Sequence, residues 1–305
     1  MPREVSMGIS TVTPEITFLH LDTPIAGYQR FIGSYLLCGQ RKAIVECGPR
    51  AALPSLLGAL AAAGVNTDDI DYVILTHIHM DHAGGIGAAI RQMSRARVVA
   101  HPRAVPHLVD PGALWEASQK QLGPLAHLYG EIEPVPPDRL VAAHDLMELD
   151  LGPGLDLQVH LTPGHASHHL SIFERTRAVL LAGEAAGVCI DGSTRPSTPH
   201  PFRLSQALSS IERLIALEPQ VLCYGHIGFH PDATGRLEAM RDRLLAWHEL
   251  VTRAATAGRD PEAILPLLKE SDRGLDYLDA LDSDELERER TLILNSIAGL
   301  AQCGP

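Results

Sequence analysis

The chain has 305 residues, 45% of them hydrophobic and 20% charged, a composition typical of a globular protein with a sizeable core. Its formal net charge of −12 argues against nucleic acid or an anionic membrane as a partner, because both require a basic surface. The 16 histidines outnumber the Phe, Tyr and Trp residues together. Since histidine is the commonest metal ligand, their placement along the chain becomes the main question.

Cysteines and the chain start suggest a cellular location. The five cysteines are scattered and form no CxxC pair, so we expect no disulfide framework and a reducing cytoplasm. The opening MPREVSMGIS has no apolar run, so no secretory signal is predicted. The longest apolar stretch, 53–65, contains Gly58 and Gly64 and is too short to span a bilayer. We therefore expect a cytoplasmic protein without a membrane segment.

Short apolar runs separated by turn residues predict strands in the first half of the chain. These runs are 16–21, 31–37, 43–47, 72–76 and 97–100. The run 72–76, YVILT, is uninterrupted, as expected of a strand buried on both faces. Residues 51–63 are rich in Ala and Leu and are followed by Gly64, which predicts a helix with a glycine stop.

The same alternation returns after Pro153. Strands are predicted at 155–161, 170–173, 178–182 and 221–224, with a helix at 204–217 between the last two. This pattern predicts an α/β core over residues 1–233. The segment 102–137 holds seven prolines and short helical stretches, and we expect it to be a helical insertion over the active site.

Residues 234–305 are almost entirely helical in pattern and are predicted to form a C-terminal helical extension. Two apolar stripes lie at helical spacing. They consist of Leu237, Met240, Leu244, Trp247 and Val251, and of Leu286, Ile293, Ile297 and Leu300. Each stripe needs a partner, either the core or a second chain, so a homodimer is expected. Asp282 or Ser283 is placed to cap the last helix.

The densest chemistry follows the buried strand, in the run Thr76-His77-Ile78-His79-Met80-Asp81-His82. His77 and His79 are two residues apart, so on extended backbone they point the same way. Asp81 and His82 are adjacent and diverge, so they can face different ions. Ligands held at the end of a rigid strand are exposed by its loop, and this spacing predicts a metal site rather than a polar loop.

Three further ligand candidates also follow strand-like runs. They are His165 in TPGH, Glu184 after Gly183, and His226 after Gly225. Each has a glycine before it, which lets the backbone turn sharply. Each signal is weak alone. Together with HxHxDH they supply five imidazoles and two carboxylates, enough for two divalent ions.

In motif order (THIHMDH, PGH, an acidic position, GH) the chain resembles the metallo-β-lactamase fold superfamily over roughly residues 15–230. The resemblance implies a four-layer αββα sandwich. It implies that His77, His79 and His165 hold one ion, that Asp81, His82 and His226 hold the other, and that Glu184 bridges them. The TPGH segment looks more like that of glyoxalase-II-type hydrolases than that of secreted β-lactamases. The run from His101 to Glu116 looks like that of a largely uncharacterised subgroup with a C-terminal helical segment.

Two positions depart from the family pattern. The family usually bridges with Asp, where this chain has Glu184. The family also tends to place an Asp in an early strand–turn that supports the site, where this chain has Glu46. The two longer carboxylates could compensate for one another.

The resemblance and the ligand types together predict two divalent ions per chain. We expect zinc, with iron or manganese as alternatives, because mixed His/carboxylate sites accept all three. Two such ions lower the pKa of bound water and produce hydroxide for attack on a carbonyl or phosphoryl centre. Asp81 is the candidate to orient that nucleophile and accept its proton. The expected substrate is a small thioester, lactone or other carboxylic ester, with phosphoesters behind.

Two other functions remain open at this point. One is a mononuclear iron oxidoreductase of the persulfide dioxygenase type, which related family members represent. The other is a non-catalytic binding or regulatory protein that keeps the fold. For the substrate pocket we single out Trp115, Tyr129 and Phe202 as apolar walls, with core packing equally open for each, and His230 at the mouth. His168 and His169 are expected to be structural.

Overall fold

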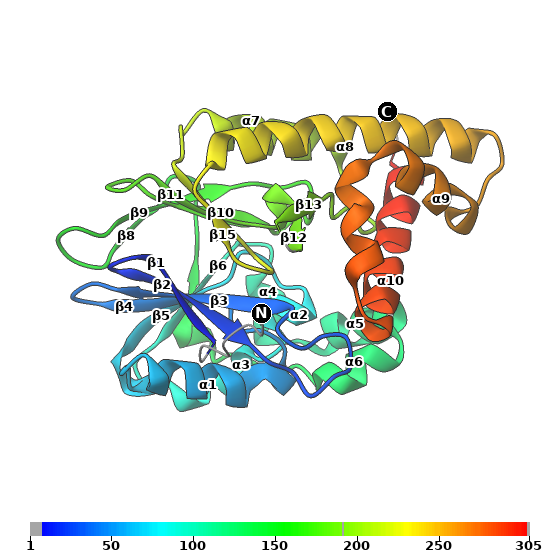
Figure 1. The fold of residues 1–305 in the computed structure, drawn as a ribbon. Helices are drawn as coiled ribbons and strands as arrows, with labels where there is room; N and C mark the ends of the chain where they lie inside the picture. The colour runs from blue at the N-terminus through cyan, green and yellow to red at the C-terminus, as the bar shows by residue number, and fades with distance from the viewer. Residues whose placement is uncertain (1–7, 191, 304–305) are drawn as a thin grey trace.

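The computed structural model describes residues 8–190 and 192–303. Two β-sheets pack face to face, and helices cover both outer faces (Figure 1). The helices on one side are α1 (Leu53–Ala62) and α3 (Ile86–Gln92). Those on the other are α7 (Leu204–Ile215) and α8 (Ala233–Thr256). The predicted αββα sandwich is confirmed.

The first sheet follows chain order. Its strands are β1 (Ile9–Thr13), β2 (Ile16–Leu21), β3 (Ile32–Cys38), β4 (Lys42–Val45), β5 (Ile70–Ile74), β6 (Arg97–Ala100) and β7 (Leu140–Ala142). Neighbours are antiparallel from β1 to β4 and parallel from β4 to β7. Parallel strands need crossovers, and α1 and α3 supply two of them.

The second sheet has the spatial order β15-β14-β11-β10-β9-β8. Its strands are β8 (Glu148–Asp150), β9 (Asp156–Leu161), β10 (Leu170–Glu174), β11 (Val179–Gly183), β14 (Val221–Tyr224) and β15 (Phe229–His230). Only β11 and β14 pair in parallel among these described strands. A separate antiparallel ribbon joins β12 (Val188–Ile190) to β13 (Ser193–Arg195).

Alternate residues of the strands enter different cores. Val45 and Ile74 point into the layer between the sheets, whereas their neighbours Ile44 and Val73 pack toward α1. This is the period of two that an extended chain imposes, and burial on both sides explains the uninterrupted apolar run of β5.

Predicted strands 16–21, 97–100 and 221–224 are confirmed at their ends, and the others shift by one or two residues. β5 was predicted at 72–76 but ends at Ile74. There the backbone N–H of Thr76 donates to the Glu46 carboxylate, not to a neighbouring strand, at 3.0 Å. The short strands β1, β7, β8, β12, β13 and β15 were not predicted. Most of these six strands have only two or three residues, which is too few to show an alternation.

Between β6 and β7 the chain leaves the sheet and forms α4 (Val105–Val109), α5 (Gly112–Leu122) and α6 (Pro124–Tyr129). These lie within the segment predicted as an insertion. Short helical pieces complete the rest of the described chain. They are α2 (Met80–Ala83) and the 3-10 turns Arg50–Ala52, Thr67–Asp69, Pro137–Arg139, Glu184–Ala186 and Arg273–Ala280.

The C-terminal helices α8, α9 (Pro261–Ser271) and α10 (Ser283–Ala301) close one end of the sandwich (Figure 1). The stripe of α8 from Leu237 to Val251 is buried against the second sheet and its helices, as predicted. Leu286 was assigned to the second stripe, but it is 41% exposed. Ile293, Ile297 and Leu300 of the second stripe are buried in the same core as the α8 stripe. Most of both stripes therefore packs within the chain, and the homodimer stays a prediction.

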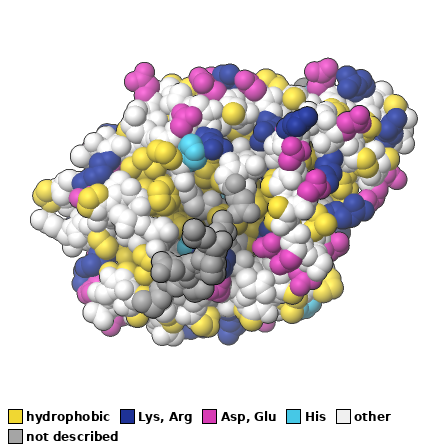
Figure 2. Space-filling model, viewed as in Figure 1, with side chains coloured by type: hydrophobic (Ala, Val, Ile, Leu, Met, Phe, Trp, Pro, Cys, Tyr) yellow, Lys and Arg dark blue, Asp and Glu magenta, His cyan; other side chains and the backbone are white. Residues whose placement is uncertain are grey.

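Asp282 caps α10: its side chain accepts from the backbone N–H groups of Asp284 and Glu285. Among the described helices, none combines the length and apolar character needed to cross a membrane. Figure 2 shows acidic and basic side chains interspersed over the C-terminal helices on this face.

Candidate metal centre

The first group of candidate ligands consists of four residues from three parts of the chain. His77 and His79 lie on the extended segment between β5 and α2, and His165 follows β9. Nδ1 of His79 lies 3.1 Å from Nε2 of His165. Ligand atoms of these three rings and of Glu184 all lie within 4.8 Å of one another. These four residues form the first ligand group.

A second ligand group lies beside the first. It consists of Asp81 and His82 in α2 and His226 after β14, with ligand atoms again within 4.8 Å of one another. Oδ2 of Asp81 lies 3.7 Å from Nε2 of His82 and 3.7 Å from Nε2 of His226. Adjacent residues diverge, so Asp81 and His82 were expected to be able to face different ions, but the structure brings both side chains to the same group.

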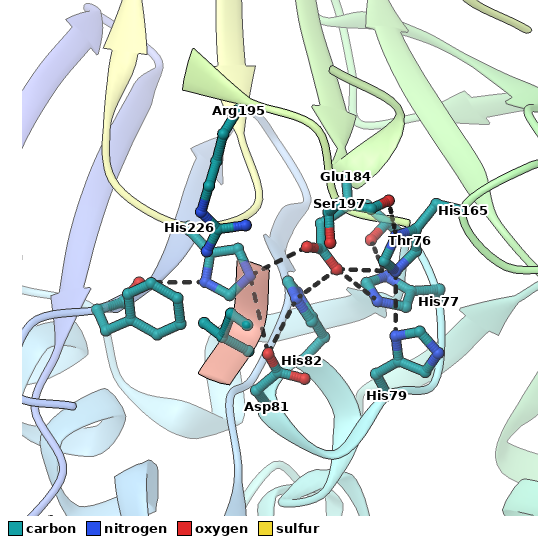
Figure 3. A network of polar contacts seen from close by, with 12 residues as sticks. Thr76, His77, His79, Asp81, His82, His165, Glu184, Arg195, Ser197 and His226 are labelled. Atoms are coloured by element: carbon teal, nitrogen blue, oxygen red, sulfur yellow. Dashed lines mark hydrogen bonds and ion pairs between the residues drawn. The ribbon is translucent and has the colours of Figure 1, made fainter. Parts of the chain in front are cut away.

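Glu184 joins the two groups, as Figure 3 shows. Its Oε2 lies 3.3 Å from Nε2 of His77 and 2.8 Å from Nε2 of His165. In the second group, Oε2 lies 3.6 Å from Nε2 of His82, and Oε1 lies 3.4 Å from Nε2 of His226. A carboxylate in contact with rings of both groups is placed to bridge two ions.

The outer nitrogens of three rings are held by the protein. Nδ1 of His165 donates to the Ser197 carbonyl at 3.0 Å, and Nδ1 of His226 donates to the Phe31 carbonyl at 3.2 Å. Nδ1 of His77 contacts Oγ1 of Thr76 at 3.0 Å. Because a carbonyl only accepts, Nδ1 of His165 and of His226 carries a proton, and Nε2 of each ring is the nitrogen that faces the centre.

The charge balance of the centre fits cations. Nε2 of His77 and both ring nitrogens of His82 are buried without a hydrogen-bond partner among the described residues. Burial lowers the pKa of His77 and of His79 well below the usual value, so both rings stay neutral and free to bind metal. Burial opposes ionisation of Glu184, yet His165, His226 and His77 hold the pKa of that carboxyl well below its usual range.

The surroundings of His82 also favour a positive charge. Burial lowers its pKa, but the carboxylates of Asp81, Glu184 and Glu46 outweigh burial and raise the pKa to about 10. The three carboxylates around His82 supply negative charge that a divalent cation would offset. The donor set of histidine nitrogens and carboxylate oxygens therefore fits two divalent ions.

Glu46 supports the centre from behind, at the position noted in the sequence. Its Oε1 accepts the backbone N–H of Thr76, and its Oε2 lies 3.8 Å from Nδ1 of His82. Burial is the main cause that raises the pKa of Glu46 to about 7. Glu46 has φ +67, a left-handed conformation unusual for a residue with a side chain. The longer carboxylate thus ties the end of β5 to a ligand ring.

Gly183 and His169 position Glu184. Gly183 has φ +57, and a Cβ there would lie 2.7 Å from Nε2 of His169 and 2.8 Å from Oγ1 of Thr76. The backbone N–H of Glu184 donates to that same Nε2 at 3.1 Å, while Nδ1 of His169 contacts Oγ1 of Thr162 at 2.8 Å. His169 is therefore structural, as expected.

A cavity of about 330 Å³ opens onto the centre. His79, Asp81, His165, Glu184 and His226 form its floor. Two helices supply apolar walls, and other lining residues come from the β12–β13 ribbon and the segment after it. The helical lining residues are Leu114, Ala117, Ser118, Gln121 and Leu122 of α5 and Leu292, Asn295 and Ser296 of α10. Both the insertion and the C-terminal extension therefore shape the space above the ligands.

The family model described as the metallo-beta-lactamase superfamily matches residues 28–226, well over half of the chain and including all seven ligand candidates. The chain belongs to the metallo-β-lactamase superfamily.

Named relatives agree with this placement. A metallo-beta-lactamase fold-containing protein of Sulfurisphaera tokodaii is 29% identical over 199 residues, covering 64% of this chain and 72% of the relative. An N-acyl homoserine lactonase of Bacillus thuringiensis is 29% identical over 179 residues, covering 56% and 61%. The crystal structure of an archaeal metallo-beta-lactamase superfamily protein from Sulfolobus tokodaii superposes with a TM-score of 0.69 at 24% identity, covering 93% and 97%.

In this metallo-β-lactamase fold the four predicted pocket residues lie away from the large cavity. Tyr129 is 2% exposed and packs with Ile25 and Met80, and Trp115 packs against the same cluster. Phe202 lines a much smaller cavity beside His165 and Glu184. His230 bonds to Arg236 and to the backbone of Asp232. None of the four is among the residues lining the large cavity.

Apart from the metal-ligand candidates, the residues that line the cavity carried no sequence signal for a pocket. Leu114, which lines the cavity, is the neighbour of Trp115, which we predicted as a pocket residue because its side chain is large and apolar. His168, predicted to be structural, is a lining residue. Arg195 also lines the cavity, but it stands in a short strand that the pattern did not reveal.

Proposed function

We propose that this protein is a dinuclear metal-dependent hydrolase that cleaves an ester-type bond of a small molecule: a lactone, a thioester or another carboxylic ester. The observation that carries the proposal is the contact of one carboxylate, Glu184, with histidines of both ligand groups. One mononuclear site would not need Asp81, His82 and His226 as a second set. Zinc is the proposed metal, because a set of imidazoles and carboxylates without a thiolate suits it.

Two bound divalent ions would supply an activated water and stabilise negative charge on the substrate oxygen. His77, His79 and His165 would hold one ion, and Asp81, His82 and His226 the other. The Asp81 side chain is 23% exposed, whereas Glu184 is only 5% exposed. Asp81 also lines the cavity. It can therefore accept a proton from the attacking water, while Glu184 remains a buried support.

The ester class rests on two supports. One relative is named an N-acyl homoserine lactonase, and it matches this chain over 179 residues. The cavity of about 330 Å³ also has the size and largely apolar lining of a small-molecule site. The interspersed charges over the C-terminal helices (Figure 2) and the net charge of −12 favour a small molecule over nucleic acid as the substrate.

Metal analysis coupled to a hydrolysis screen tests the proposal. We expect two zinc equivalents per chain and turnover of at least one class among lactones, thioesters and carboxylic esters, lost on chelation and in Asp81→Ala. One iron per chain with oxygen consumption on glutathione persulfide would support the oxidoreductase instead. Protein that binds no metal tightly and turns over no substrate would be a binding or regulatory protein.

A further inference from the structure

Arg195 is a buried arginine at the wall of the large cavity. It ends β13 and is 1% exposed. Its Nε donates to Oε2 of Glu289 in α10 at 2.7 Å. Its Nη2 is buried without a hydrogen-bond partner among the described residues. A guanidinium nitrogen left unpaired away from water costs free energy, so a missing acceptor at this place has a physical consequence.

The cluster around Arg195 also carries surplus charge. Arg288, 3% exposed, shares the same carboxylate, with Nε 3.1 Å from Oε1 of Glu289. The hydroxyl of Tyr277 donates to Oε2 at 2.6 Å. Two buried guanidinium groups therefore face one carboxylate. Counted over Arg195, Arg288 and Glu289 alone, the cluster carries one net positive charge.

Arg288 is not the arginine that could bind a ligand in the cavity. Its guanidinium lies 4.2 Å from the centre of the Phe31 ring, and its Nη1 donates to the carbonyl of Gly27. It is not among the residues lining the cavity, whereas Arg195 is. The unsatisfied nitrogen and the surplus charge thus meet at Arg195.

Arg195 borders the same cavity as the metal centre. Figure 3 shows the side chain of Arg195 on the same side of the ligand groups as His226. Arg195, His226 and Asp81 line the same cavity. Leu114 and Leu122 of α5 and Leu292 of α10 line its apolar part. A ligand in this cavity would meet metal ligands, a cation and apolar surface together.

We propose that Arg195 binds a carboxylate of the substrate, so that the ester cleaved at the metal centre is the ester of a molecule that also carries a free carboxylate and an apolar portion. This rests on the proposed hydrolase function. A carboxylate supplies the acceptor that Nη2 lacks, and its single negative charge equals the surplus of the Arg195–Arg288–Glu289 cluster. Low exposure strengthens the pairing because little water competes for it.

Matched chromogenic esters test this inference. The mono-p-nitrophenyl ester of adipic acid and p-nitrophenyl hexanoate have acyl chains of equal carbon number, and only the first has a free carboxylate. We expect the metal-loaded protein to prefer the adipate ester in kcat/KM by about 10- to 100-fold, the value of a hydrogen bond to a charged group. Arg195→Gln should abolish that preference through KM, and Arg195→Lys should retain part of it. Arg253→Gln, at an exposed pair on α8, should leave it unchanged.

A binding measurement separates this inference from the hydrolase proposal. Titration calorimetry would compare hexanoate with hexanamide on the metal-loaded wild type and on Arg195→Gln, with circular dichroism to check folding. We expect hexanoate to lose about 10-fold or more in affinity in the variant and hexanamide to be unaffected. Equal hexanoate affinity in both proteins would overturn the inference, because the carboxylate would then bind elsewhere, and Arg195 would only tie β13 to α10. If no lactone, thioester or carboxylic ester is hydrolysed, the hydrolase proposal fails, while the binding result still decides on Arg195.

Discussion

Oε2 of Glu184 lies 2.8 Å from Nε2 of His165, while Oε1 of the same carboxylate lies 3.4 Å from Nε2 of His226. The Glu184 side chain therefore contacts a histidine of the first ligand group and a histidine of the second. Glu184 is therefore the carboxylate that contacts both ligand groups.

Two substitutions of Glu184 distinguish the effect of its charge on metal binding from the effect of its side-chain length. Glu184→Asp keeps the carboxylate, and we expect it to retain two ions per chain, because the negative charge between the groups remains. Glu184→Gln removes that charge, and we expect at least one ion to be lost on dialysis. Metal content by mass spectrometry is the measurement. If the Asp variant lost both ions and the Gln variant kept both, the bridging role would be wrong.

His79→Ala removes a ligand without opening the core. We expect loss of metal and at least a 100-fold fall in hydrolysis, with the far-UV circular dichroism retained, because the fold does not depend on that ring. His248→Ala is the matched control, since His248 is on α8 and its ring contacts Thr252 at an exposed position. Full metal content in His79→Ala would refute the ligand assignment.

Glu46→Gln tests support from behind the ligands. The amide oxygen can still accept from Thr76, but it no longer faces Nδ1 of His82 with a charge. Partners of this kind are worth about 10- to 100-fold in metal affinity. Competition with a chromophoric chelator would measure the change. An affinity equal to that of the wild type would show that Glu46 only holds the backbone of Thr76.

Glu289 gives a pH dependence of stability. Burial raises its pKa, but Arg195, Tyr277 and Arg288 outweigh burial and hold the pKa at about 2. The folded pKa lies below that of the unfolded chain, so the contribution is present above about pH 5 and is lost as pH falls toward 2. Its size is about 3 kcal/mol. Urea unfolding of wild type and Glu289→Gln from pH 7 to pH 3 should show their difference shrinking; a constant difference would contradict this.

Leu244 and Leu245 are adjacent on α8 and differ in burial. Leu244 is 3% exposed in the core of the C-terminal helices, whereas Leu245 is 43% exposed. Leu244→Ala should lower the free energy of unfolding by about 2–5 kcal/mol, because it removes buried methyl groups and leaves a cavity. Leu245→Ala should change it by less than about 0.5 kcal/mol. Similar losses in both variants would mean that this face of α8 is not anchored as described.

Local patterns in the sequence were enough to predict the main strands and the seven ligand candidates, and the resemblance in motif order predicted the sandwich. The apolar run 72–76 and the HxHxDH motif after it are contiguous, and contiguous residues keep their mutual geometry in any fold that buries the strand. The spacing of His77 and His79 therefore predicted that both rings point to the same side, and both belong to the first ligand group. The glycines before His165, Glu184 and His226 were likewise local signals of a turn.

The cavity and Arg195 could be known only from the tertiary structure. Arg195 and Glu289 are 94 residues apart, and Leu114 of α5 faces the same cavity as Leu292 of α10 only because the C-terminal helices fold back over the insertion. The pocket prediction chose large aromatic side chains, and Tyr129 instead lies in a closed core at 2% exposure. Size and hydrophobicity predict burial, but which buried surface borders an open space depends on how distant elements pack. The sequence alone therefore determined the fold and the ligand candidates, because both follow from local patterns and motif order, and the packing of distant elements decided what can approach those candidates.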